Sequence, residues 1–216
     1  FVVKVKKILE CVCVNCGKLK ADISDPNFAD RIRHVRDPKA RMSIVWSFCK
    51  TKMICEADEP KDENEVNDDD AKKGHGGCGA VQPQIRKEGL KLFVQYKKSK
   101  DEDEEMKSLQ PDKRLFPPSE VYAVLRKISD TDLYLLGLSD EYARPEWMIL
   151  TVMPVPPPPV RPSIAVDGGT MRSEDDLTYK LGDIIKASAN VRRCEQEGAP
   201  AHVIIEFEQL LQFQVS

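Results

Sequence analysis

A run of prolines in the second half of the chain most constrains what the chain can fold into. Pro156–Pro159 are four consecutive prolines, which fix φ and remove four backbone donors. The chain must therefore cross this stretch as a stiff, extended polyproline II segment with a set direction. The residues just before it, Met148–Val152, form a short apolar run of β-formers bounded by prolines. This pattern predicts a buried strand that runs directly into the rod.

Composition indicates a soluble chain with a core. Its 216 residues are 41% hydrophobic and 32% charged, enough for one or two globular units. No stretch approaches the roughly 20 apolar residues of a membrane span, and the N-terminus lacks a signal-peptide pattern, so no membrane partner is expected. The chain starts at Phe1 rather than at methionine, which predicts that it begins inside a longer protein. The net charge of −3 argues against a uniformly basic surface but allows local basic patches.

The first two thirds of the chain predict an α+β fold of helices and short strands. Residues 1–18 look β-like and end in a cysteine turn, whereas residues 28–48 have helical spacing broken at Asp37-Pro38. A strand is expected over Gly89–Tyr96. Further helices are expected after an N-cap at Ser119 and over Asp132–Leu138.

Two polar segments are predicted to be disordered loops, near 57–73 and 97–114. They contain too few apolar residues to bury enough surface to become ordered. The first segment is also compatible with an acidic interaction tail.

The C-terminal residues predict two helices joined by a short turn. Ser173-Glu174-Asp175-Asp176 resembles a capping box, and Gly198-Ala199-Pro200 should break the helical pattern before a second helix over 203–213. A narrow apolar seam with charged residues elsewhere favours a projecting antiparallel coiled coil. The alternative is that each helix packs on a globular core.

Seven cysteines without a secretion signal favour a reducing compartment and thiols kept for metal binding or burial. Cys13 and Cys16 form a CxxC knuckle followed by Gly17; no βαβ pattern surrounds it, as a redox pair would require. The glycine-rich loop around Cys78 and the irregular backbone at Cys55 supply the preferred remaining ligands. The predicted site is therefore a closed structural zinc centre. Its ligands are Cys13, Cys16, Cys55 and Cys78, with His75 as the competing ligand and Cys11, Cys49 and Cys194 as unligated thiols.

Several motifs resemble one family of proteins. The run Arg144–Pro162 closely resembles the clamp region of the largest subunit of eukaryotic, fungal-type RNA polymerase II. Other segments of the chain also resemble this subunit and occur in the same order as in it, along nearly the whole chain. The chain departs from the subunit in the two acidic loops. The similar segments are Cys11–Leu19, Cys49–Glu56, Gly76–Gly79, Gln82–Leu90, Asp175–Thr178, 190–199 and Leu210–Phe213.

This resemblance implies a nuclear transcription protein in three parts. Residues 1–152 would be a zinc-containing clamp core and head, 153–173 a proline-rich lead into the lid, and 174–216 part of the clamp coiled coil. The clamp closes over DNA and the RNA–DNA hybrid, the lid helps separate transcript from template, and the coiled coil docks general initiation factors and NusG-class elongation factors. Other polymerase subunits are the remaining partners implied.

The resemblance also implies that this segment has no catalytic residues. Nucleotidyl transfer and its Mg²⁺ belong to the complete DNA-directed RNA polymerase. Contacts to phosphate or to factors are expected near the lid and coiled coil, with ordinary solvated charge as the alternative for each residue. The candidates are Arg161, Arg172, Lys180 and Lys186.

Two rival functions remain open at this point. Pro156–Arg161 satisfies the PxxPxR pattern that docks in aromatic SH3 grooves. The fused apolar run before it is unusual for such ligands, which generally lie in polar, disordered surroundings. The chain could also be a zinc-stabilised interaction module with no role in a polymerase.

Overall fold

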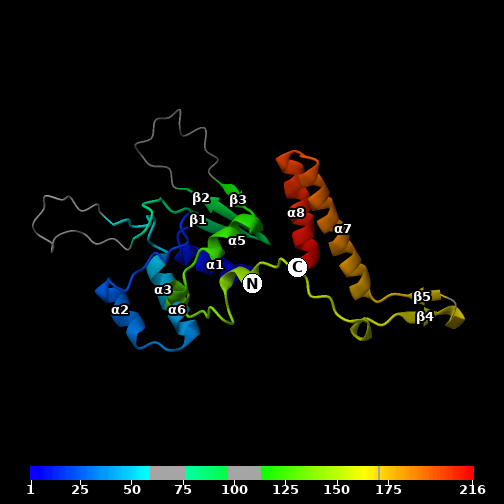
Figure 1. Ribbon diagram of the computed structural model, residues 1–216, viewed down its shortest axis with the longest axis horizontal. Coiled ribbons are helices and arrows are strands. Elements are labelled where there is room, and N and C mark those ends of the chain that lie inside the picture. The colour runs from blue at the N-terminus through cyan, green and yellow to red at the C-terminus, as the bar shows by residue number, and fades with distance from the viewer. Residues whose placement is uncertain (59–75, 97–112, 170) are drawn as a thin grey trace, which may run out of the picture. The chain divides into compact units, whose positions relative to one another are not determined.

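A computed structural model describes residues 1–58, 76–96, 113–169 and 171–216 (Figure 1). It divides the chain into two compact units, Phe1–Leu150 and Thr151–Ser216. Most of the two predicted disordered loops, and His75, lie outside the described residues. Within the described ranges, no helix combines the length and apolar character needed to cross a membrane.

The first unit begins with three helices, α1 (Val2–Cys11), α2 (Pro26–Arg33) and α3 (Pro38–Cys49). The side chains of Asp25 and Asp37 cap α2 and α3, and a proline opens each helix. The predicted break at Asp37-Pro38 is therefore confirmed.

The prediction of a β-like N-terminus was wrong, because residues 2–11 form α1. Val5, Ile8 and Leu9 recur at helical spacing and are buried in the core. Their burial outweighs the preference of the β-branched valines for extended backbone. The cysteine turn follows directly, closed by an isolated bridge between Val12 and Leu19.

A three-stranded antiparallel sheet packs on these helices. Its strands β1 (Gln84–Glu88), β2 (Lys91–Gln95) and β3 (Arg114–Phe116) lie in the order β1-β2-β3. Strand β2 confirms the strand expected within Gly89–Tyr96. Alternate residues of the sheet join the main core, which also takes in α1, α3, α5 and α6. The sheet residues in the core are Ile85, Leu92, Val94 and Phe116.

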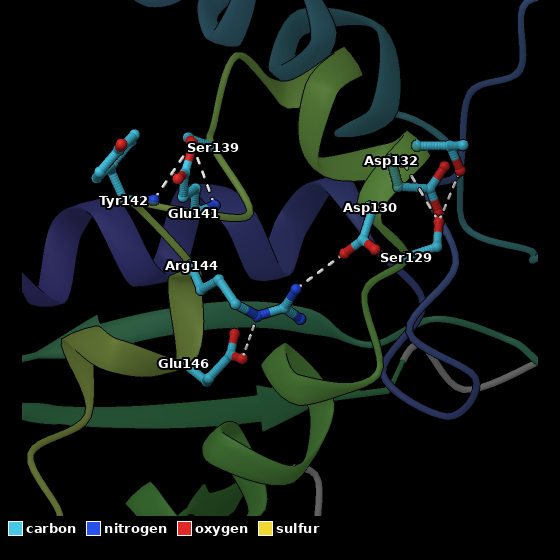
Figure 2. Close-up of polar contacts among 9 residues, drawn as sticks. Ser129, Asp130, Asp132, Ser139, Glu141, Tyr142, Arg144 and Glu146 are labelled. Carbon is cyan, nitrogen blue, oxygen red and sulfur yellow. Dashed lines mark hydrogen bonds and ion pairs between the residues drawn. The ribbon is translucent and has the colours of Figure 1, made fainter.

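Two short helices, α5 (Pro118–Arg126) and α6 (Asp130–Leu136), follow the sheet. Both were expected, but Ser119 lies inside α5 and the capping position is Pro117. Pro118 explains the shift, because its fixed φ suits the first helical position. For α6, Ser129 supplies the cap by accepting a hydrogen bond from the Asp132 N–H (Figure 2).

The predicted buried strand at Met148–Val152 was also wrong. Pro145–Met148 form a 3₁₀ turn, η1, and Leu150 and Val152 are 59% and 81% exposed. Pro145 and Glu146 are the buried residues of this stretch instead.

An ion-pair network holds the stretch in place. The Arg144 guanidinium reaches Glu146 at 2.5 Å and Asp130 at 2.9 Å. Figure 2 shows Arg144 between these two carboxylates, which come from η1 and the start of α6. The conformation of the segment before the prolines is thus held by a polar network and not by strand pairing.

The second unit starts with the proline run. The backbone is extended up to Pro157, but Pro158–Val160 turn into a 3₁₀ helix, η2. A two-stranded hairpin then pairs β4 (Ile164–Val166) with β5 (Met171–Ser173), joined by the turn η3 (Asp167–Gly169). The predicted stiff rod is therefore shorter than the run of prolines.

Two helices complete the second unit, α7 (Asp176–Gln196) and α8 (Ala201–Val215). Asp175, not Ser173, caps α7 through the Leu177 N–H. The predicted break is confirmed, with Gly198 at φ +66° in the turn. The helices run antiparallel side by side in Figure 1, and the Lys180 ammonium donates to the Gln214 amide at 2.7 Å. That they form a projecting coiled coil stays a prediction.

Candidate metal centre

Three chain segments bring four thiols together in the first unit. They are the knuckle at Cys13–Cys16, the segment around Cys55 and the loop around Cys78. The second and third segments are paired by backbone hydrogen bonds from Cys55 N to Ala80 O at 3.0 Å and from Gly79 N to Cys55 O at 2.8 Å. As a result, the sulfur atoms of Cys13, Cys16, Cys55 and Cys78 all lie within 4.8 Å of one another.

The spacing of the sulfurs matches tetrahedral coordination. The Cys13 and Cys78 sulfurs are 3.5 Å apart and the Cys16 and Cys55 sulfurs 3.8 Å apart. Four sulfurs each about 2.3 Å from a central zinc ion would be about 3.8 Å from one another. The cluster could therefore hold a metal ion, and soft thiolates in a tetrahedral set favour Zn²⁺. Because all four positions come from the protein, the geometry is that of a structural site.

Polar contacts from α5 and α6 hold the knuckle. The Lys127 ammonium at the end of α5 donates to the Asn15 carbonyl at 2.8 Å. The buried Asp132 carboxylate at the start of α6 accepts a hydrogen bond from the Leu19 N–H at 3.1 Å. The middle of the cysteine turn and its C-terminal end are thus each fixed to a neighbouring helix.

Two glycines are required where the backbone passes close to its neighbours. At Gly17, with φ +77°, an added Cβ would lie 2.4 Å from the Cβ of Lys127. At Gly77 an added Cβ would lie 2.5 Å from the Cys55 sulfur. Both glycines lie beside ligand cysteines, so side chains there would disturb the cluster.

Three of the thiols have shifted pKa values. Burial raises the pKa of Cys16, and it raises the pKa of Cys55 to about 12. Burial acts in the same direction on Cys13, but hydrogen bonds from the backbone N–H groups of Cys16 and Asn15 outweigh it and bring the Cys13 pKa to about 7. Cys13 therefore ionises more easily than Cys16 or Cys55, and binding of a divalent ion would release the protons that Cys16 and Cys55 hold.

The other cysteines lie outside the cluster. Cys11 and Cys49 are fully buried in α1 and α3. The Cys11 thiol donates to the Lys7 carbonyl at 3.1 Å. Cys194 is buried in α7 of the second unit.

The four predicted phosphate or factor contacts lie along the second unit. Arg161 donates to the Pro156 carbonyl at 2.9 Å and to the Thr178 hydroxyl at 3.1 Å, so it fastens the proline turn to the start of α7. Arg172 donates to the Ser163 hydroxyl at 2.9 Å, and Lys180 is engaged with Gln214. Lys186 is exposed on α7. Three of the four thus have contacts within their own unit.

Together, the closed four-thiol cluster, which could hold a metal ion, and the small sheet packed on helices define a domain of mixed α and β structure. The chain belongs to the family described as RNA polymerase Rpb1, domain 1, whose family model matches residues 1–216. It is thus an N-terminal region of the largest subunit of a DNA-directed RNA polymerase, and its process is transcription.

Proposed function

We propose that this chain is the clamp region of the largest subunit of RNA polymerase II from a fungus, which acts in the nucleus. The family match over the whole chain carries the proposal. The motifs from Cys11–Leu19 to Leu210–Phe213 support the narrower assignment to polymerase II. In this role the chain closes over DNA and the RNA–DNA hybrid, and other polymerase subunits surround it.

The metal centre has a bracing role in this proposal. Cys13, Cys16, Cys55 and Cys78 hold Zn²⁺, which ties the knuckle to the paired segments around Cys55 and Cys78. Nucleotidyl transfer, with its Mg²⁺, belongs to other parts of the complete enzyme. This chain contributes grip on nucleic acid and separation of its strands.

The second unit supplies the lid and a docking surface. Residues 153–173 lead into the lid, with Arg172 at the β4–β5 hairpin able to face phosphate. Residues 174–216 form the clamp coiled coil, to which general initiation factors and NusG-class elongation factors bind. Exposed apolar side chains and basic residues of this unit support such docking. These residues are Leu177, Ile185, Leu210 and Phe213, with Lys180 and Lys186.

The structure gives the SH3-ligand alternative little support. SH3 grooves take an extended polyproline helix with its arginine available. Here Pro158–Val160 turn away from the extended form, and the Arg161 guanidinium is bound to Pro156 and Thr178. Docking would require both features to be undone.

Capture of partners from nuclear extract tests the proposal. The tagged 216-residue chain is expected to retain polymerase II subunits and a NusG-class elongation factor. Ile185→Asp with Leu210→Asp, on the exposed surface of α7 and α8, should lower factor capture at least tenfold. Pro156→Ala with Pro159→Ala is the matched control and should leave factor capture unchanged. Factor binding that survives the aspartates but is lost with the alanines would refute the clamp assignment and support a proline ligand.

A further inference from the structure

Gln82 is a fully buried polar side chain beside the thiol cluster. It is 1% exposed and lies just before β1. Its amide oxygen accepts a hydrogen bond from the Val14 N–H at 3.0 Å. Its amide nitrogen donates to the Cys13 sulfur at 3.1 Å and to the Ala80 carbonyl at 2.9 Å. Both amide hydrogens and the oxygen therefore have partners, as a buried amide requires.

These contacts reach every segment that supplies a thiol. The bonds to Val14 and Cys13 hold the knuckle, and the bond to Ala80 holds the loop that contains Cys78. The backbone N–H of Gln82 donates to the Met53 carbonyl at 2.7 Å, which fixes the segment before Cys55. One residue thus joins the three segments without being a ligand.

The contact to Cys13 also has an electronic consequence. An amide N–H that donates to an ionised sulfur forms a charge-assisted hydrogen bond, which favours the thiolate and fixes its orientation. Groups that hold a metal ligand in this way commonly change metal affinity by about 10- to 100-fold when they are removed.

We propose that Gln82 is the positioning residue of the metal centre: its buried side-chain amide ties the Cys13–Cys16 knuckle to the loop of Cys78 and orients the Cys13 thiolate, while its backbone N–H holds the segment before Cys55. This inference rests on the zinc site proposed above. It makes metal affinity depend on a side chain that does not touch the ion. Only an amide of this length supplies two donors and an acceptor here. Glutamate lacks the donors, and methionine has similar length but neither function.

Metal titration of the full chain tests the inference. Zinc affinity is measured by competition with a chromophoric chelator for the natural chain and for Gln82→Met. The variant should bind zinc about 10- to 100-fold more weakly. With Co²⁺ as the probe, the sulfur-to-metal charge-transfer band should move to longer wavelength, because a thiolate that loses a hydrogen bond gives up electrons more easily.

Gln84→Met is the matched control. Gln84 is half-buried on β1, two residues further along. Within the described part of the chain, no hydrogen bond joins its side chain to a thiol. This variant should leave both the zinc affinity and the Co²⁺ band unchanged. If Gln82→Met fails to fold, Gln82→Glu serves as the second variant, since it keeps the shape and the acceptor while losing the donors; it should show the same loss.

The possible outcomes separate the inference from the zinc assignment. Absence of Zn²⁺ and Co²⁺ binding by the natural chain would refute the zinc site and the role of Gln82 with it. Binding by the natural chain, with affinity and band unchanged in Gln82→Met or Gln82→Glu, would overturn the role of Gln82 alone. A variant with reduced thermal stability but an unmoved band and affinity would also overturn it, since Gln82 would then only fill space.

Discussion

At the scale of single residues, Gly77 shows how tightly the backbone wraps the thiol cluster. A Cβ at this position would lie 2.5 Å from both the Cys55 sulfur and the Glu56 carbonyl. We expect Gly77→Ala to displace Cys55 and weaken zinc binding at least tenfold, measured by chelator competition.

Gly79→Ala is the control for this effect. Gly79 has φ +73°, but an added Cβ would meet only Ala57, at 3.9 Å. This variant should lose about 1 kcal/mol of stability from backbone strain and keep its metal affinity. Equal affinity for the Gly77 and Gly79 variants would contradict the predicted crowding at Cys55.

Arg161 was predicted from sequence as a contact to phosphate, and the structure suggests a second role. Its bonds to Pro156 and Thr178 join the start of the four-proline run to the first turn of α7. We expect Arg161→Lys to lose the two-point contact and about 1 kcal/mol of local stability. Hydrogen exchange of amides in the first turn of α7 should speed up about fivefold at that cost.

Arg172→Lys is the comparison for Arg161, since Arg172 bonds a single hydroxyl in the hairpin. It should leave exchange at the start of α7 unchanged. Unchanged exchange in Arg161→Lys as well would leave phosphate contact as the better explanation for this arginine.

Residue-level prediction was most specific where chemistry restricts the choice, although metal binding by the four cysteines stays a prediction. Thiols near a CxxC knuckle and a glycine-rich loop have few other uses, so the structure brings together the four that sequence selected. Gln82 was missed as a contributor because a glutamine near a turn is usually solvated. Only its place four residues after Cys78 could have drawn attention to it.

At the scale of elements, the α7–α8 hairpin contains a carboxylate whose charge disfavours folding. Partial burial raises the pKa of Glu208 above its ordinary 4.5, and the nearby Glu195 adds to the rise. The folded hairpin therefore holds this proton more tightly than the unfolded chain does. Its stability falls as pH rises from about 4.5 through the folded pKa, and stays lower above that.

We expect Glu208→Gln to stabilise the hairpin at pH 7, because the substitution removes the charge that the natural side chain carries there. Below pH 4 it should give no gain, because natural Glu208 is then protonated. The melting temperature should rise by about 1 °C at pH 7. Circular dichroism at both pH values measures this. Glu206→Gln, at an exposed position of α8, is the control. A gain of equal size at both pH values would contradict an electrostatic origin.

Element prediction failed where local preference and tertiary burial disagree. The valines of residues 2–5 favour a strand locally, but Val5, Ile8 and Leu9 fill the core only when that run is helical. Met148–Val152 has the composition of a buried strand, yet the Arg144–Glu146 ion pair fixes a 3₁₀ turn there. Neither core packing nor an ion pair can be deduced from the spacing of apolar residues along the sequence.

At the scale of the whole molecule, the two units differ in how they are stabilised. The main hydrophobic core lies entirely within the first unit. Among described residues of the second unit, only Ala187 and Cys194 are buried apolar ones. The first unit is therefore the part whose stability should respond to the metal.

Removal of zinc by a strong chelator should consequently act on one unit only. We expect hydrogen exchange to increase at residues 12–19, 53–56 and 76–82, and to stay unchanged in α7 and α8. Exchange followed by mass spectrometry measures both units in one sample. Added zinc should restore the natural pattern, whereas equal loosening of the helical hairpin would show that the metal does not act locally.

The general α and β character of the chain and the division near its prolines could be anticipated, because composition and periodicity change there. The second unit illustrates the limit. Its two helices were predicted from the spacing of apolar residues. What these helices pack against or bind could not be predicted, because so little of their surface is buried within the chain.

The pairing of Cys55 with the loop of Cys78 has a consequence for how the chain tolerates change in length. The Cys78 backbone nitrogen lies 3.4 Å from the Cys55 sulfur, so the two ends of the segment between these residues are close together. The entropy of closing such a loop grows only with the logarithm of its length, and doubling the length costs about 0.6 kcal/mol. With both ends held at the thiol cluster, a change in the number of residues between Cys55 and Cys78 should cost the fold little.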